Sequence, residues 1–143
     1  MYAKNYLEKA INIEERIKNK NLEIEQWRTI ATKTSASAEG ERVQTSTSLH
    51  KMEDAAIKIV ELEQEAKEMR SKLIEKKAEI IKTIDQVEDA ESYSVLHLRY
   101  VQGMTLEKIA ETKEISVSTV ERKLNSAYEL VQVILEKREK DGK

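Results

Sequence analysis

The chain has 143 residues, with 25 Lys plus Arg against 27 Asp plus Glu, so its formal net charge is −2. It contains no Cys, which excludes disulfides, thiolate metal sites and thiol nucleophiles. Glu, Lys, Ile, Leu and Ala are abundant while Pro is absent and Gly is rare, and this composition is typical of long helices. The sequence therefore predicts an all-α protein, either one domain or a small domain with an extension.

The hydropathy pattern gives no sign of a membrane segment. A bilayer-spanning helix needs about 20 consecutive apolar residues, and no such run is present. The first residues, MYAKNYLEKA, lack the basic stretch and apolar core of a signal peptide. We expect a soluble, cytoplasmic protein with no membrane partner.

Residues 2–31 carry apolar side chains at alternating steps of three and four, which is a heptad pattern. A helix of this length extends about 45 Å, and so narrow a stripe cannot hold it alone. The polar interruption of the stripe is Lys20, and Trp27 marks a place where the packing widens. The stripe comprises Ala3, Tyr6, Ala10, Ile13, Ile17, Lys20, Ile24, Trp27 and Ala31.

The segment 32–48, TKTSASAEGERVQTSTS, interrupts this pattern with Ser and Thr, which favour caps and turns over helix interiors. We expect a mobile loop there, with Thr47 or Ser48 capping the next helix. The heptad pattern returns over residues 49–87. Residues 1–88 are thus predicted to form a long antiparallel coiled-coil hairpin with its loop at about 32–48.

The second helix is the longer one, so part of its apolar surface is left over. This surplus either covers the core of the segment that follows or makes a dimer contact, and the two alternatives carry even weight. We expect a homo-oligomer, with a dimer favoured. The candidate oligomerisation residues are Ile17, Ile24, Trp27, Ile74, Ile80, Ile81 and Ile84.

Residues 85–92, DQVEDAES, form either a joint or a continuous helix, and residues 89–143 are predicted to be a helix-turn-helix domain. A first helix over 90–101 ends at Gly103, which suits a left-handed cap. Thr105 caps a short second helix over 106–113. Ser116 caps a third helix, extending to about Ala127, whose inner face carries Val120, Leu124 and Ala127.

The spacing within residues 105–124 predicts the function of this domain. A small residue, Ala110, lets two helices cross closely, and Ile115 and Val120 fill the angle between them. The start of the third helix is then free to enter a major groove of double-stranded DNA. The candidate DNA-binding residues are Thr105, Ser116, Val117, Ser118, Thr119, Arg122 and Lys123.

The run LHLRYVQGMTLEKIAETKEISVSTVERKL resembles region 4 of bacterial sigma factors, the part that reads the −35 promoter element. The whole chain, including LHKMEDAAIKIVELE, resembles the phage late-gene transcription activators of the RinA and ArpU type. The resemblance implies a phage or prophage transcriptional regulator of Gram-positive bacteria. It also implies that bacterial RNA polymerase is a partner.

The chain departs from the family pattern in its charges. Glu114 stands where the family's turn usually has Gly, which predicts a longer or differently shaped turn. Glu121 and Ser126 stand where basic residues are frequent. From Asp89 onward, nine Lys plus Arg face ten Asp plus Glu, unlike a strong autonomous DNA binder. Either several copies act together, or RNA polymerase contributes, or DNA binding is weakened.

Two alternatives remain beside the regulator hypothesis. A small terminase subunit, which binds packaging-site DNA as a ring, also joins a helix-turn-helix to a coiled coil. A protein-binding adaptor or inhibitor would use the coiled coil as its active surface, in keeping with the acidic balance. We expect no enzyme, no cofactor and no metal site, because His50 and His97 lack partners at ligand spacing and the paired carboxylates lack a catalytic partner.

Overall fold

The computed structural model describes residues 2–40 and 45–142, and the described side chains are those of residues 2–33 and 49–142. All elements in these ranges are helical, which confirms the all-α class. In chain order they are α1 (Tyr2–Gly40), α2 (Thr45–Asp85), α3 (Ala90–Leu96), the π-helical turn η2 (His97–Val101), α4 (Leu106–Lys113) and α5 (Val117–Asp141). No helix in the described part of the chain is long and apolar enough to cross a membrane.

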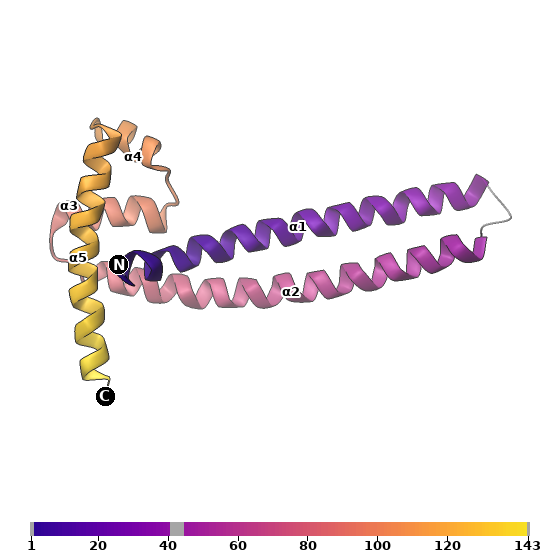
Figure 1. Cartoon of the computed structure of the whole chain (residues 1–143), viewed down its shortest axis with the longest axis horizontal. Coiled ribbons are helices and arrows are strands. Elements are labelled where there is room, and N and C mark those ends of the chain that lie inside the picture. The colour runs from indigo at the N-terminus through magenta and orange to yellow at the C-terminus, as the bar shows by residue number, and fades with distance from the viewer. Residues whose placement is uncertain (1, 41–44, 143) are drawn as a thin grey trace. The chain divides into compact units, whose positions relative to one another are not determined.

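Helices α1 and α2 form a long helical hairpin, as predicted, and Figure 1 shows them side by side with opposite directions. The predicted loop is wrong over residues 32–40 and 45–48, which are helical, and its remaining residues, 41–44, lie outside the described part. Ser and Thr cost little in a helix interior, under about 0.7 kcal/mol each relative to Ala. The Thr32 hydroxyl donates to the Arg28 carbonyl one turn back, so it does not compete with the helix.

The chain packs into two compact units, and their boundaries cut through both long helices. The hairpin unit is Ile13–Lys72. The helix-turn-helix unit combines the start of α1, up to Asn12, with everything from Leu73 onward. The sequence pattern predicts a different boundary, between residues 88 and 89. The heptad repeat continues through the ends of both helices without a change in spacing, so it does not indicate that these ends belong to another unit.

The hairpin unit buries a thin apolar stripe. Its buried hydrophobic side chains, among those described, are Ile24, Ala55, Leu62 and Ala66. Lys20 forms ion pairs with Glu65 across the hairpin at 3.0 Å and with Glu23 at 3.4 Å. Hydrogen bonds to these carboxylates raise the pKa of Lys20, so the polar interruption of the stripe has partners that fix the pairing of the two helices.

The helix-turn-helix unit has a larger core, to which every one of its helices contributes. The start of α1 supplies Ala3, Tyr6, Leu7 and Ala10, and the end of α2 supplies Ile80, Ile84 and Val87. The remaining buried residues come from the C-terminal helices and are Val95, Leu96, Tyr100, Ile109, Ala110, Val120, Leu124, Ala127, Tyr128, Val131 and Leu135. The C-terminal helices therefore pack against the start of α1 and the end of α2.

Polar contacts inside this core are paired. The Tyr6 and Thr83 hydroxyls lie 3.0 Å apart, and Arg138 Nη2 donates to the same Thr83 oxygen at 3.0 Å. The Tyr100 and Tyr128 hydroxyls lie 2.6 Å apart. Burial raises the pKa of both Tyr100 and Tyr128, so this pair stays protonated and hydrogen-bonded at neutral pH.

The structure divides the predicted oligomerisation residues. Ile80 and Ile84 are fully buried in the core of the helix-turn-helix unit, so assigning them to a dimer contact is wrong. In the hairpin unit Ile24 is buried and Ile17 and Trp27 are half-buried. Ile74 and Ile81 remain available, at 71% and 37% exposed. Of the four candidate residues on α2, two thus pack in this core and two lie on the surface.

Candidate nucleic-acid interface

The turn between α4 and α5 has the shape of a tight helix-turn-helix connection. Glu114 ends α4 in the left-handed region, with φ 57° and ψ 46°. The Glu114 N–H donates to the Glu111 carbonyl at 3.3 Å, and the Ile115 N–H donates to the Ala110 carbonyl at 3.0 Å. This pair of bonds is a Schellman motif. Ile115 packs against the core, and the turn is short although Glu114 stands where Gly is usual. The expectation of a longer or differently shaped turn is therefore wrong.

Both helices of the motif begin with the predicted caps. Thr105 Oγ1 accepts from the Lys108 N–H at 3.1 Å, and Ser116 Oγ accepts from the Thr119 N–H at 3.1 Å. The hydroxyls of Ser116 and Thr119 also lie 2.8 Å apart. Gly103 ends the preceding turn with φ +72°, as predicted. Thr105 and Ser116 therefore act first as structural caps, and the Thr119 hydroxyl contacts the cap of α5.

The first turns of α5 present one outward face, and it is opposite the buried face. Val120, Leu124 and Ala127 are buried. Ser118 and Arg122, one turn apart, are exposed. The start of α5 therefore has one side that packs in the core and one side that is exposed to solvent.

Asn125 is an exposed residue of this face that the sequence reasoning missed. Ser118, Arg122 and Asn125 follow each other at steps of four and three, so they share one side of α5. That spacing was visible in the sequence. Asn is a residue that can pair with adenine through two hydrogen bonds, so its position here adds to the candidate interface.

Two further candidate DNA-binding residues, Val117 and Lys123, are less exposed to solvent. Val117 is half-buried and packs against the core. Lys123 lies on the flank of α5, where its Nζ binds Glu91 Oε1 of α3 at 2.9 Å. Lys113, from the end of α4, binds the same oxygen at 3.1 Å. Hydrogen bonds from Lys123 and then Lys113 lower the pKa of Glu91, which is charged at neutral pH.

Neither Lys113 nor Glu91 was among the candidate site residues. Glu91 follows Asp89, whose side chain accepts from the Ser92 N–H at 2.9 Å and caps α3. Residues 86–89 are outside the helices, so the acidic segment is a joint rather than a continuous helix. No sequence signal marks Glu91 as a partner of lysines 22 and 32 positions later, because that proximity exists only after α3, α4 and α5 have packed.

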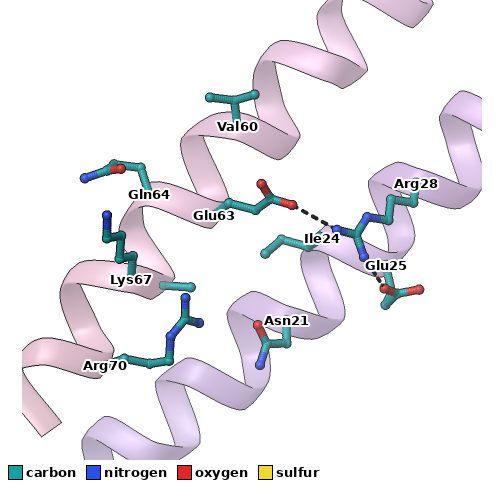
Figure 2. A pocket seen from close by; sticks show the side chains of 10 residues that line it. Asn21, Ile24, Glu25, Arg28, Val60, Glu63, Gln64, Lys67 and Arg70 are labelled. Carbon is teal, nitrogen blue, oxygen red and sulfur yellow. Dashed lines mark hydrogen bonds and ion pairs between the residues drawn. The ribbon is translucent and has the colours of Figure 1, made fainter. Parts of the chain in front are cut away.

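The hairpin unit has a second candidate surface, a groove of about 580 Å³ between α1 and α2. Figure 2 shows Arg28 bridging Glu25 and Glu63 at the rim, with distances of 2.8 and 2.9 Å. Among the described residues, the lining side chains Lys67 and Arg70 have no ion pair. Val60 is exposed beside them. The groove thus combines an apolar residue with two unneutralised cations.

Comparison with known proteins gives the chain a family. A family model described as "Protein of unknown function (DUF1492)" matches residues 32–132, which is most of the chain. The chain belongs to the DUF1492 family. The matched region extends from the end of α1 through α2 and most of α5. It covers the candidate interface of α5 and the α2 side of the groove, whereas the α1 side of the groove precedes it. No curated protein and no solved structure matches the chain.

The DUF1492 description assigns no activity, and the described side chains contain no group of three or more His, Asp or Glu arranged to hold a metal ion. His97 Nδ1 lies 3.0 Å from Gln102 Nε2, within hydrogen-bond distance. His50 Nδ1 lies 4.0 Å from Glu53 Oε2. The function must therefore be argued from the helix-turn-helix geometry.

Proposed function

We propose that this protein is a DNA-binding transcriptional regulator, encoded by a phage or prophage, that inserts the first turns of α5 into the major groove. The observation that carries this proposal is the exposed face of α5 directly after a short left-handed turn. Arg122 is central on this face and has no ion pair within the described residues. An unpaired Arg can make two hydrogen bonds to guanine, which is the commonest base-specific contact.

The remaining contacts would come from the helix starts. The capped N-termini of α4 and α5 carry partial positive charge, which favours nearby phosphates. Ser118 and Asn125 lie beside Arg122 and supply short polar groups. The acidic balance of the unit predicts weak binding by one copy, so a second copy or RNA polymerase would add affinity.

The test is DNA binding by Arg122→Ala against a site selected from random-sequence duplexes with the wild-type protein. We expect a loss of affinity of about 5- to 150-fold, which corresponds to the usual range of about 1–3 kcal/mol for one base-specific pair. Arg16→Ala is the matched control, since it removes the same charge from an exposed position of the hairpin unit. Adding Lys123→Ala should lower the affinity further and reduce the salt dependence. Unchanged binding by the double variant would show that α5 does not read DNA.

A second candidate function, a protein-binding adaptor, is favoured by the hairpin groove and its exposed Val60. Its test is binding of purified bacterial RNA polymerase by Val60→Asp and by Lys67→Glu with Arg70→Glu. As an adaptor, the protein should lose polymerase binding in these variants. The adaptor role is excluded if wild type and variants bind polymerase equally while Arg122→Ala weakens DNA binding.

A further inference from the structure

Glu91 is the meeting point of cationic side chains from two different helices. Its Oε1 atom lies 2.9 Å from Lys123 Nζ of α5 and 3.1 Å from Lys113 Nζ of α4. Because both ammonium groups touch the same oxygen, they are close to one another as well. Two like charges at such a distance repel, so this position needs an anion between them.

The two lysine side chains are less exposed than the carboxylate that they contact. The Lys113 and Lys123 side chains are 18% and 30% exposed, so their aliphatic parts are packed against the unit, whereas the Glu91 side chain is 47% exposed. An anion arriving from solvent can thus reach the ammonium groups by replacing Glu91. An exposed ion pair contributes only about 0–1 kcal/mol, so little stability opposes the exchange.

Arg122 connects this cluster to the outward face of α5. It lines a hollow of about 190 Å³ together with Glu91, Lys123, Ser92, Asp89 and Ser126. A duplex whose major groove receives Arg122 has a phosphate backbone along the flank of the same helix. A phosphate has several acceptor oxygens, so it can bind both lysines at once, as the single carboxylate oxygen does now.

We propose that Lys113 and Lys123 form a binding site for a DNA backbone phosphate, and that Glu91 occupies this site in the free protein. The proposal rests on the proposed function, since it assigns a phosphate contact and an inhibitory carboxylate to the same DNA-binding interface. Glu91 leaves the lysines when DNA binds, and its displacement reduces the affinity. In the free protein, two of the lysines beside the exposed face of α5 are thus neutralised by a carboxylate of the same unit.

The experiment compares Glu91→Gln with Glu88→Gln, a matched control. Glu88 is an exposed carboxylate three residues away with no ion pair within the described residues. Both changes remove one negative charge, but only the first frees the lysines. We expect Glu91→Gln to bind the selected DNA about tenfold more tightly than Glu88→Gln does. Its plot of log affinity against log salt should also be steeper by up to about 0.9, the change in slope for one phosphate contact.

Glu91→Asp provides a second variant that keeps the charge, and its shorter side chain cannot reach both lysines. It should bind DNA with an affinity between those of wild type and Glu91→Gln, which separates release of the lysines from loss of charge. Adding Lys113→Gln and Lys123→Gln to Glu91→Gln should abolish the gain. Equal affinities for Glu91→Gln and Glu88→Gln overturn the proposal.

A readout without DNA keeps the two proposals distinguishable. Inorganic phosphate, titrated into Glu91→Gln and followed by NMR, should shift the signals of Lys113 and Lys123, and should shift them much less in Glu88→Gln. If wild type and variants bind no DNA but phosphate shifts these lysines, the proposed function fails and the anion site stands. If phosphate leaves both lysines unshifted in Glu91→Gln, the site itself is refuted.

Discussion

The hairpin unit and the helix-turn-helix unit are made partly of the same two helices, yet they are stabilised differently. In the hairpin unit each helix buries a stripe against one neighbour, and ion pairs such as Lys20 with Glu65 lie along the contact. In the helix-turn-helix unit the ends of α1 and α2 pack against three further helices. The difference shows that a heptad pattern fixes a pair of helices, whereas a globular core depends on segments that are distant in sequence.

The largest expected effect comes from removing a core side chain of each unit. Leu7→Ala, at a fully buried position, should cost about 3 kcal/mol of unfolding free energy, in the range of about 2–5 for buried leucines. Leu62→Ala should cost nearer 2 kcal/mol, because two helices with solvent on both sides can close around the lost volume. Urea unfolding followed by circular dichroism measures both.

Trp27 is the sole Trp of the chain and belongs to the hairpin unit, so its fluorescence reports that unit separately. Leu7→Ala should shift the circular dichroism transition more than the Trp27 transition, and Leu62→Ala should do the reverse. Coincident shifts of both signals in both variants would mean that the two units unfold as one.

The buried tyrosine pair tests whether the core of the helix-turn-helix unit depends on polar contacts as the hairpin does. Tyr100→Phe or Tyr128→Phe leaves one buried hydroxyl without its partner, so each should cost about 1–2 kcal/mol. The double variant removes both hydroxyls and should cost less than the sum of the single changes. Thermal melts of the four proteins measure this cycle, and strictly additive losses would contradict a coupled pair.

The left-handed turn offers a stabilising change. Glu114→Gly should raise the unfolding free energy by about 1 kcal/mol, since a side chain in this conformation costs about 1–2 kcal/mol. Glu111→Gly, inside α4, should lower it by up to about 1 kcal/mol and serves as the matched control. Thermal midpoints should therefore move in opposite directions, and a loss with Glu114→Gly would mean that the Glu114 side chain stabilises the turn.

The smallest expected effect is a difference in pH response. Hydrogen bonds from Lys76 and Lys123 lower the pKa of Glu79 and Glu91 in the folded state. Their contribution is present above the unfolded pKa near 4.5 and is lost as the pH falls through the lower folded values. Lys20 has a raised pKa, so its contribution is full below 10.5 and is lost as the pH rises through the higher folded value.

The helix-turn-helix unit should consequently weaken on the acid side and the hairpin unit on the alkaline side. Glu79→Gln with Glu91→Gln should remove part of the acid dependence, by less than about 1 kcal/mol because these pairs are exposed. Melts between pH 3 and pH 7, compared with those of the Glu88→Gln variant, measure it. Identical acid dependence in wild type and the double variant would show that the ion pairs contribute nothing.

Much of the candidate interface was predictable because its signals are local. A cap needs one hydroxyl three residues before an N–H, and Thr105 and Ser116 were placed correctly from this rule alone. The sequence was misleading at residues 32–40, where Ser and Thr suggested a loop although the helix continues. At Glu114 the absence of Gly suggested a changed turn, but packing of Ile115 stabilises the motif against a cost of about 1–2 kcal/mol.

The sequence alone determined the helices, most of their boundaries and the side of α5 that faces the core, because these depend on spacing within a few turns. The expected end of the third helix at about Ala127 was wrong, since α5 continues to Asp141. Only the tertiary structure decided that Ile80 and Ile84 cover the helix-turn-helix rather than a second copy. It alone brought Glu91 to Lys113 and Lys123. The physical reason is that an ion pair between helices distant in sequence produces no repeating pattern of residues. Its two side chains meet only after packing of the core has positioned those helices.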